Sequence, residues 1–304
     1  MRKIVCIILV SLLLCLTACG GDTASEQPTP TPTVEVTVTP DCAEPTPTPT
    51  PTPVPTPTWS EEPETMTIML EGMEETMYGY RYTSALGYSM VYDPDWVRPE
   101  QREGYDHYTA VTEIDVPELY LRVTKAEGSV EQVIADLEAQ GAEKVGNAMF
   151  GGFPCVQLSK MSGYGPADVV VNYYVMQAGN TVFVPETSYF WEAAEGFGTR
   201  MWYMLDSIRF ADAPAATELK LMFRDKEIKD FTSAIGDVTY VTLLPNAGAY
   251  LEAAEWTTDN EDVCELYTDD SGCYIEIKAE GNAKVTAKCG DLEKSVFVRA
   301  INSW

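Results

Sequence analysis

A proline-rich, low-complexity stretch at residues 27–58 sets the main limit on how this 304-residue chain can fold. Thr-Pro dipeptides repeat at 28–33 and again at 45–58. Each proline fixes its φ angle and removes a backbone donor, so the stretch favours solvated polyproline II rather than a packed element. At about 3.1 Å per residue it forms a spacer of at most about 100 Å. The folded domains are therefore expected after it.

The segment at 1–18 has the order of an export signal. Basic Arg2 and Lys3 precede a thirteen-residue apolar run at 4–16, which small residues follow. As a helix the run spans about 20 Å, less than the roughly 30 Å of a bilayer core. We therefore expect a signal peptide over residues 1–18 rather than a permanent membrane span.

The four residues Leu16-Thr17-Ala18-Cys19 resemble the lipobox of bacterial lipoproteins. The resemblance implies cleavage before Cys19 and a diacylglyceryl group on its thiol, with residues 19–63 as lipidated cysteine and linker. Two acyl chains hold a protein more firmly than one, because each buried CH₂ adds about 0.8 kcal/mol. We expect an extracytoplasmic protein at the cell surface, anchored to the membrane through lipid. An ordinary secretory signal and an uncleaved anchor are the alternatives.

The charge of the chain excludes one class of partner. Removal of Arg2 and Lys3 takes the formal charge from −27 to −29. Such an acidic surface repels phosphate polymers, so we expect no nucleic acid partner. No Lys or Arg occurs from Cys19 to Tyr80, so this stretch cannot dock on anionic lipid and the acyl chains must anchor the protein.

Residues 64–212 show the pattern of a first domain with strands and two helices. Ser129 and Gln132 form a capping box at the start of a helix, and Gly141 stands where a helix ends. Gly179-Asn180 is a two-residue hairpin signal. The expected strands include 66–70, 119–123, 145–149, 153–158, 168–176 and 181–184, and a final helix is expected over 194–208. This order predicts an α+β sandwich.

A family resemblance gives the same expectation for this domain. The segment LGYSMVYDPDW at 86–96 resembles the opening of PsbP-like domains, and MLDSIRF at 204–210 resembles their closing helix and strand. The resemblance implies an antiparallel sheet with helices and no enzyme chemistry. It supplies no binding residues.

Residues 215–304 show seven short runs of strand pattern, which predict an all-β sandwich. The segments WTTDN at 256–260, DSG at 270–272, GNAKVTA at 281–287 and VFV at 296–298 resemble the group 2 bacterial immunoglobulin-like domain. The resemblance implies a spacer or adhesive module. Cys264, Cys273 and Cys289 are not part of that pattern.

The sequence does not decide whether the cysteines form disulfides. Two of Cys264, Cys273 and Cys289 can pair outside the cytoplasm, while the pairing of Cys42 and Cys155 is also undecided. Three cysteines without a nearby histidine or CxxC spacing are poor evidence for zinc, and burial as small apolar residues is the default.

Catalytic and metal signals are weak. His107 is the single histidine of the chain, and its polar, tyrosine-flanked surroundings predict a surface loop. Asp93 and Asp95 form a carboxylate pair that suits acid/base chemistry on a glycan, although Asp-Pro-Asp is first a turn signal. The acidic loops 259–262 and 269–270 lack calcium-loop spacing. We expect no catalytic residue, metal or cofactor.

These expectations favour a non-enzymatic surface lipoprotein whose domains bind an envelope or extracellular protein or a glycan. Exposed members of an aromatic set could stack on such a ligand: Tyr164, Tyr173, Tyr174, Tyr189, Phe190, Trp191, Trp202 and Tyr203. The runner-up is a cell-wall or glycan-processing enzyme that uses paired carboxylates. A transporter's solute-binding component is the third class, but the chain does not supply its two α/β lobes.

Overall fold

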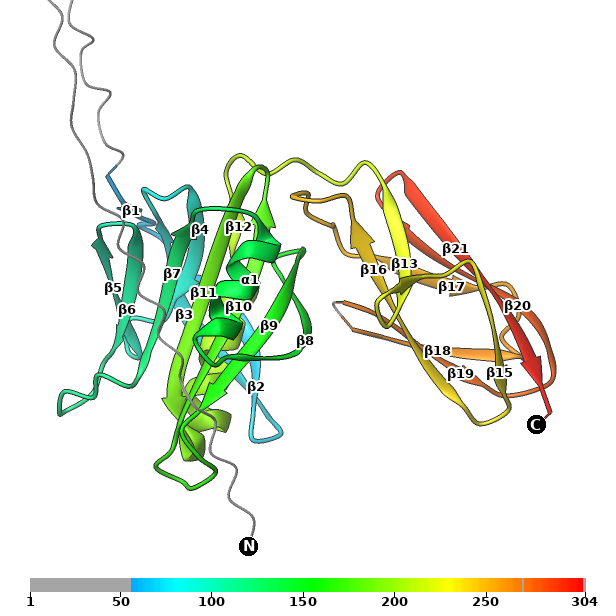
Figure 1. Ribbon diagram of the computed structural model, residues 1–304, viewed down its shortest axis with the longest axis horizontal. Coiled ribbons are helices and arrows are strands. Elements are labelled where there is room, and N and C mark those ends of the chain that lie inside the picture. The colour runs from blue at the N-terminus through cyan, green and yellow to red at the C-terminus, as the bar shows by residue number, and fades with distance from the viewer. Residues whose placement is uncertain (1–55, 270, 303–304) are drawn as a thin grey trace, which may run out of the picture. The chain divides into compact units, whose positions relative to one another are not determined.

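Strands dominate the computed structural model, which describes residues 56–269 and 271–302 (Figure 1). Of the described residues 57% lie in strands and 11% in helices. The predicted signal peptide, Cys19, Cys42 and most of the predicted linker lie outside the described residues. Among the described helices, none has the length and apolar character needed to cross a membrane.

Two sheets and a short helical set make up the first domain, which we define as β1 to β12. The smaller sheet contains β1 (Thr58–Trp59), β2 (Glu64–Leu70), β3 (Met73–Thr83), β4 (Tyr88–Tyr92) and β12 (Arg209–Phe210). Strand β3 is its centre, because β1, β2 and β4 all pair with it in antiparallel fashion.

The larger sheet has seven antiparallel strands in the order β5-β6-β7-β11-β10-β9-β8. They are β5 (Val97–Arg102), β6 (Tyr105–Ala110), β7 (Tyr120–Ala126), β8 (Glu143–Phe150), β9 (Phe153–Met161), β10 (Val169–Ala178) and β11 (Thr181–Phe190). The predicted hairpin at Gly179-Asn180 is confirmed, since Ala178 pairs with Thr181 and Gly179 has a φ of 57°.

The main core of this domain draws buried residues from both sheets. It includes Ile68 and Tyr82 of the smaller sheet and Tyr108 and Leu121 of the larger one. Burial alternates along β6 and β7, as the period of a strand with one face on the core requires.

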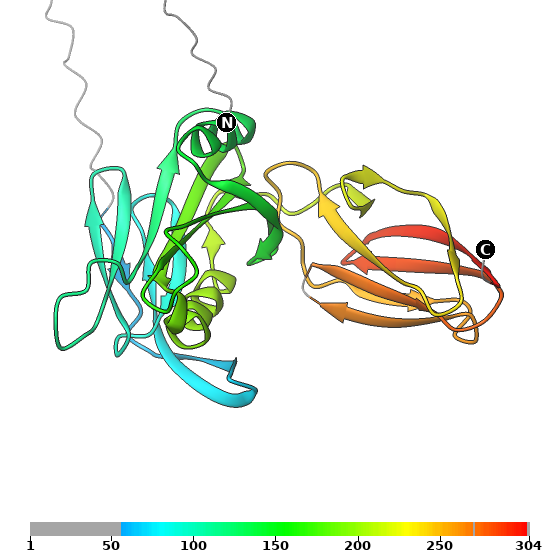
Figure 2. The same ribbon diagram turned by 60° about the horizontal axis from the view of Figure 1, so that its bottom comes forward.

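The helices lie on opposite faces of the larger sheet (Figures 1 and 2). Helix α1 (Val130–Ala139) packs on the outer face through Val133, near Val175 and Val182. The second helical segment comprises the 3₁₀ turn η1 (Trp191–Ala193), the π-helix η2 (Ala194–Gly198) and α2 (Thr199–Asp206). It joins the main core.

The predicted α+β sandwich of PsbP-like type is wrong for the first domain. The structure fits a β-sandwich, because antiparallel sheets supply most of its residues and helices supply few. Helix α1 is only ten residues long, and Val133 is its one buried residue. It therefore covers too little of the sheet to form a separate helical layer. The expected continuous helix over 194–208 is instead divided into the π-helix η2 and the α-helix α2, and the 3₁₀ turn η1 precedes it.

The start and end of α1 follow the sequence signals. The Ser129 hydroxyl accepts a hydrogen bond of 3.3 Å from the backbone N–H of Gln132. Gly141 has a φ of 90°, and Ala142 donates its N–H to the Leu137 carbonyl at 3.1 Å, which closes the last turn.

The second domain, β13 to β21, consists of two sheets around one buried cluster. One sheet has the order β14-β13-β16-β19-β18 and the other β15-β21-β20-β17. The strands are β13 (Leu219–Phe223), β14 (Lys226–Glu227), β15 (Asp230–Ala234), β16 (Val238–Pro245), β17 (Glu255–Thr258), β18 (Cys264–Asp269), β19 (Gly272–Ile277), β20 (Gly281–Cys289) and β21 (Leu292–Ile301). Strand β15 runs parallel to β21.

Two hairpin turns of the first domain contact the second within the compact unit Thr52–Trp304. The Leu251 N–H donates to the Gly152 carbonyl at 2.8 Å. The Gly179 N–H donates to the Gly248 carbonyl at 2.7 Å.

Candidate functional site

The candidate site is a cavity of about 630 Å³ in the first domain, which we call the aromatic pocket. It forms where the β2–β3 turn, the residue before β5, the β6–β7 loop and the segment η1–η2 meet. Its lining consists of Glu71, Trp96, Val111, Thr112, Leu119 and residues 191–197. Its walls are mainly apolar, and its lining includes the three carboxylates of Glu71, Glu192 and Glu195.

A tight turn fixes Trp96 at one wall of the pocket. The Asp93 carboxylate accepts a hydrogen bond of 2.9 Å from the Asp95 N–H, and the Asp93 carbonyl accepts from Trp96 and Val97 at 3.1 and 3.0 Å. Burial raises the pKa of the Asp93 carboxyl. The predicted carboxylate pair, Asp93 and Asp95, therefore forms part of a turn, and the Asp93 carboxylate is already hydrogen-bonded to the backbone.

Another wall comes from the start of the second helical segment. The Trp191 N–H donates to the Asp168 carbonyl at 2.8 Å, which fixes the point where η1 begins. Gly198 packs closely behind this wall, because an added Cβ would lie 3.1 Å from the Tyr189 ring. Phe197 is buried, while Trp191 keeps 48% of its surface exposed. Single π-helical turns of this kind are frequent at functional sites.

The charges around the pocket are negative and unpaired. Glu71, Glu192 and Glu195 are exposed, and none of them forms an ion pair among the described residues. The neighbouring guanidinium of Arg200 lies 3.9 Å from the Trp96 ring centroid and pairs with Glu75 at 3.2 Å. The pocket can therefore accept neutral or cationic groups and repels anions.

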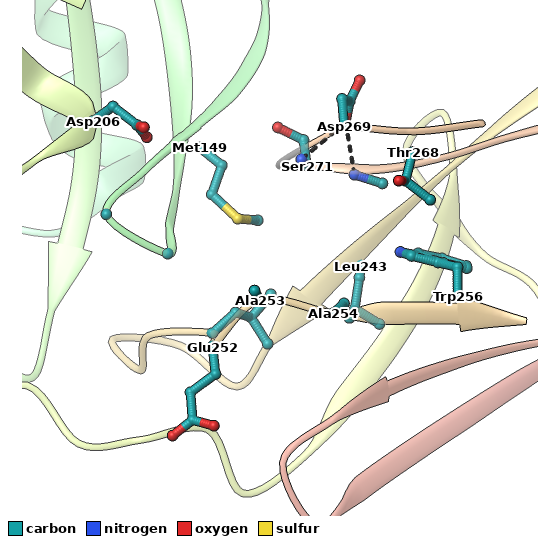
Figure 3. Close-up of a pocket in the computed structure, with 14 residues that line it drawn as sticks. Met149, Asp206, Leu243, Glu252, Ala253, Ala254, Trp256, Thr268, Asp269 and Ser271 are labelled. Atoms are coloured by element: carbon teal, nitrogen blue, oxygen red, sulfur yellow. Dashed lines mark hydrogen bonds between the residues drawn. The ribbon is translucent and has the colours of Figure 1, made fainter. Parts of the chain in front are cut away.

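A second cavity of about 410 Å³ lies among turns that are already hydrogen-bonded (Figure 3). The Met149 side chain points toward its centre, whereas the Glu252 carboxylate points away. The Asp269 carboxylate accepts 2.9 Å hydrogen bonds from the N–H groups of Ser271 and Gly272, drawn as dashed lines. This carboxylate also accepts from the Tyr240 hydroxyl at 2.8 Å. The Asp269 carboxylate thus stabilises the connection between β18 and β19.

His107 lies in strand β6, so its predicted place in a surface loop is wrong. Its ring is 5.0 Å from the Tyr120 ring, and its buried Nδ1 has no hydrogen-bond partner. Burial lowers the pKa of His107, and the charges of Arg102 and Arg122 lower it further. No serine or cysteine side chain bonds to His107 among the described residues, so the nucleophile and base of a triad are not brought together.

The four described cysteines are free and buried. Burial raises the pKa of Cys155 to about 12 and that of Cys273 to about 12. Burial also raises the pKa of Cys264 and Cys289. These thiols behave as small apolar core residues, with little thiolate to react or bind metal at neutral pH.

The acidic loops also serve the fold. The Asp259 carboxylate accepts a 2.7 Å hydrogen bond from the Lys284 N–H. The described part of the chain contains no group of three or more His, Cys, Asp or Glu residues arranged to hold a metal ion. The expectations of no metal and no cofactor stay predictions.

The predicted aromatic set is dispersed over the first domain. Tyr164, Trp191 and Trp202 are exposed, whereas Tyr174 is buried. Of the predicted set only Trp191 lines the pocket. Sequence reasoning missed Trp96, Phe197 and the carboxylates Glu71, Glu192 and Glu195 as pocket residues. The Asp-Pro-Asp turn signal at residues 93–95 could have indicated that Trp96 is held in a fixed position. Nothing in the sequence indicates that Glu71 lies close to the segment after β11.

Comparison with known proteins assigns no family. No protein-family model and no curated protein matches this chain. A crystal structure of a protein from Bacteroides thetaiotaomicron VPI-5482 is similar over 44% of this chain and 48% of that chain, at 15% identity and a TM-score of 0.31. This chain therefore spans about half the length of that protein, and the likeness carries no argument about fold or function.

Proposed function

We propose that this chain is a membrane-anchored extracytoplasmic lipoprotein that binds a ligand in its aromatic pocket. The observation that carries the binding role is the exposed Trp191 beside a cavity of about 630 Å³ whose rim carboxylates have no ion-pair partner. Ligand sites are concave and mostly apolar, with a few polar groups that orient the ligand. The pocket has this character.

The anchoring role rests on the sequence before the folded domains. The apolar run at 4–16 and the lipobox at 16–19 support lipidation of Cys19, and the Pro/Thr stretch supports display away from the membrane. In this proposal the second domain is a bacterial immunoglobulin-like spacer or adhesive module. The partner is a protein or glycan of the envelope or its surroundings.

Metabolic labelling tests the anchor. Cells that produce the full chain are grown with a fatty-acid probe, and the wild type is compared with a Cys19→Ala variant. We expect label on the wild type and none on the variant. Label that persists at the N-terminus of the variant would refute the assignment.

Calorimetric titration tests the binding role. The full-length protein in detergent is titrated with basic peptides and with neutral cell-wall oligosaccharides, and Trp191→Ala is compared with Tyr164→Ala. Tyr164 is the matched control, because it is an aromatic residue outside the pocket with 85% of its surface exposed. Binding that Trp191→Ala abolishes and Tyr164→Ala spares supports the proposal. Cleavage of an oligosaccharide would instead favour the glycan-processing enzyme.

A further inference from the structure

We propose that the aromatic pocket binds the lysine or arginine side chain of a polypeptide partner. This inference rests on the binding role proposed above and names the class of its ligand. It follows from four features of the pocket: its charge, its aromatic walls, its apolar lining and its small number of side-chain hydrogen-bond donors.

The charge of the pocket selects for a cation. Glu71 approaches from the β2–β3 turn, while Glu192 and Glu195 come from η1 and η2, so carboxylates from two separate segments line one cavity. No Lys, Arg or His is among its lining residues. Arg200 does not offset these carboxylates, because Glu75 already pairs with it. An incoming ammonium or guanidinium group would thus meet acceptors that have no other cationic partner.

The aromatic walls suit the same group. The Arg200 guanidinium lies 3.9 Å from the centroid of Trp96 and occupies that face of the indole, so Trp191 is the indole open to an incoming cation. Trp191 is a second indole on the same cavity and remains 48% exposed. A cation over an exposed indole gains about 0.5 to 1 kcal/mol, and about 2 kcal/mol when it is desolvated.

The apolar lining accommodates the stem of such a side chain. Val111, Leu119 and Phe197 provide aliphatic and aromatic surface in the same lining as the carboxylates. Lysine and arginine bury their methylene stems against such a surface while the charged end stays near acceptors and water. The cavity of about 630 Å³ leaves room for residues next to the basic one.

A neutral sugar fits the pocket less well. Sugar hydroxyls both donate and accept, and the side chains here supply mainly acceptors. Besides the indole N–H groups, the side-chain donor of the lining is the Thr112 hydroxyl, which already donates to the Ile114 carbonyl at 2.5 Å. Sugar oxygens that lose water would therefore find few side-chain donors, at a cost for each oxygen left unpaired.

Titration with defined peptides tests the inference. The full-length protein is titrated calorimetrically with a peptide that carries Lys and Arg beside apolar residues, with the same peptide bearing Glu at the basic positions, and with spermidine. We expect the basic peptide to bind and the acidic peptide not to bind. A Glu192→Gln/Glu195→Gln variant should bind about three- to tenfold more weakly, as two partly exposed ion pairs predict. Binding should also weaken when salt rises from about 50 to about 500 mM.

A matched variant shows whether the effect belongs to the pocket. Glu138 and Glu143 are exposed carboxylates outside the pocket lining, so Glu138→Gln/Glu143→Gln makes the same change in net charge elsewhere. It should leave the affinity for the basic peptide unchanged. Equal losses in the two double variants would overturn the inference, because the attraction would then come from overall charge.

The remaining outcomes separate this inference from the proposed function. If spermidine binds and the basic peptide does not, the polypeptide partner is wrong. If a neutral oligosaccharide binds in a way that depends on Trp191 and the basic peptide does not, the ligand class is wrong while the binding role stands. If no probe responds to Trp191→Ala, both proposals fail.

Discussion

Tyr88 donates a 2.8 Å hydrogen bond to the carboxylate of Asp106, which is fully buried in the core of the first domain. The Tyr82 hydroxyl donates to the same carboxylate at 3.0 Å, and the Ser84 hydroxyl donates to it as well. No Lys, Arg or His bonds to this carboxylate among the described residues, so the hydroxyls of Tyr82, Ser84 and Tyr88 satisfy it. The network links β6 of the larger sheet to β3 and β4 of the smaller one and the residue after β3.

Removal of this carboxylate should destabilise the protein strongly. Asp106→Ala leaves three buried hydroxyls without their acceptor, which we expect to lower the free energy of unfolding by about 3 kcal/mol. Denaturant unfolding followed by tryptophan fluorescence measures the change. The exposed Asp115→Ala is the control and should have a value close to that of the wild type. A loss for Asp106→Ala as small as the control's would mean that the network contributes little.

The contact between Gly152 and Leu251 depends on glycine. A Cβ at Gly152 would lie 2.1 Å from the Leu251 carbonyl oxygen, in a residue with a φ of +82°. Gly104 has a φ of +81° and no atom within 4 Å of the same added Cβ. Gly104→Ala should therefore cost about 1 kcal/mol from the backbone alone. Gly152→Ala should cost clearly more in thermal unfolding, and equal costs would argue against the contact.

Protonation of His107 should destabilise the fold. Burial and the nearby arginine charges lower its pKa below the ordinary 6.5, so the unfolded chain binds a proton at a higher pH than the folded one. Stability from the neutral ring is present above about pH 6.5 and is lost as the pH falls toward the folded-state pKa.

The test compares the wild type with His107→Gln between about pH 8 and about pH 5. The many carboxylates titrate in both proteins, so the difference between the two unfolding free energies isolates the histidine. We expect the wild type to lose stability relative to the variant as the pH falls. A difference that does not change with pH would contradict the lowered pKa.

The described cysteines should react with a thiol reagent only after unfolding. Cys155, Cys264, Cys273 and Cys289 are buried, and burial raises the pKa of each thiol. In the mature, lipidated Cys42→Ala protein, from which Cys6 and Cys15 have been cleaved with the signal peptide, we expect four thiols to become reactive in denaturant and to be protected in the native protein. Rapid reaction of the native protein, or a disulfide found by mass spectrometry, would contradict the buried free thiols.

The sequence predicted local features of the fold better than its layers. Ser129 and Gly141 marked the ends of α1 because caps act within one turn, and Gly179 marked a hairpin because its φ is local. The predicted fold class of the first domain was wrong. The spacing of apolar residues indicates that a helix exists, but it does not show how much of the sheet that helix covers. Helix α1 covers too little of it to form a layer. His107 was misplaced for a similar reason, since its tyrosine neighbours suit a strand as well as a loop.

The pocket could be predicted only in part. Trp191 was among the aromatics considered as stacking residues, and Asp93 correctly indicated a turn. Glu71 enters the site through the pairing of β2 with β3, and that tertiary position leaves no mark in the sequence around it. The split of the helical segment into η1, η2 and α2, which presents Glu192 and Glu195, was equally hidden.

Photocrosslinking in intact cells tests most directly whether the aromatic pocket is the binding site. A photoreactive amino acid replaces Thr112, an exposed residue of the pocket lining, in one full-length variant and Tyr164 in another, and covalent adducts are resolved by mass. Trp191 stays in place in both variants, so the pocket keeps the indole that the account assigns to binding. Our account predicts a discrete adduct from position 112 and none from position 164. No adduct from position 112, or the same adducts from both positions, would contradict it.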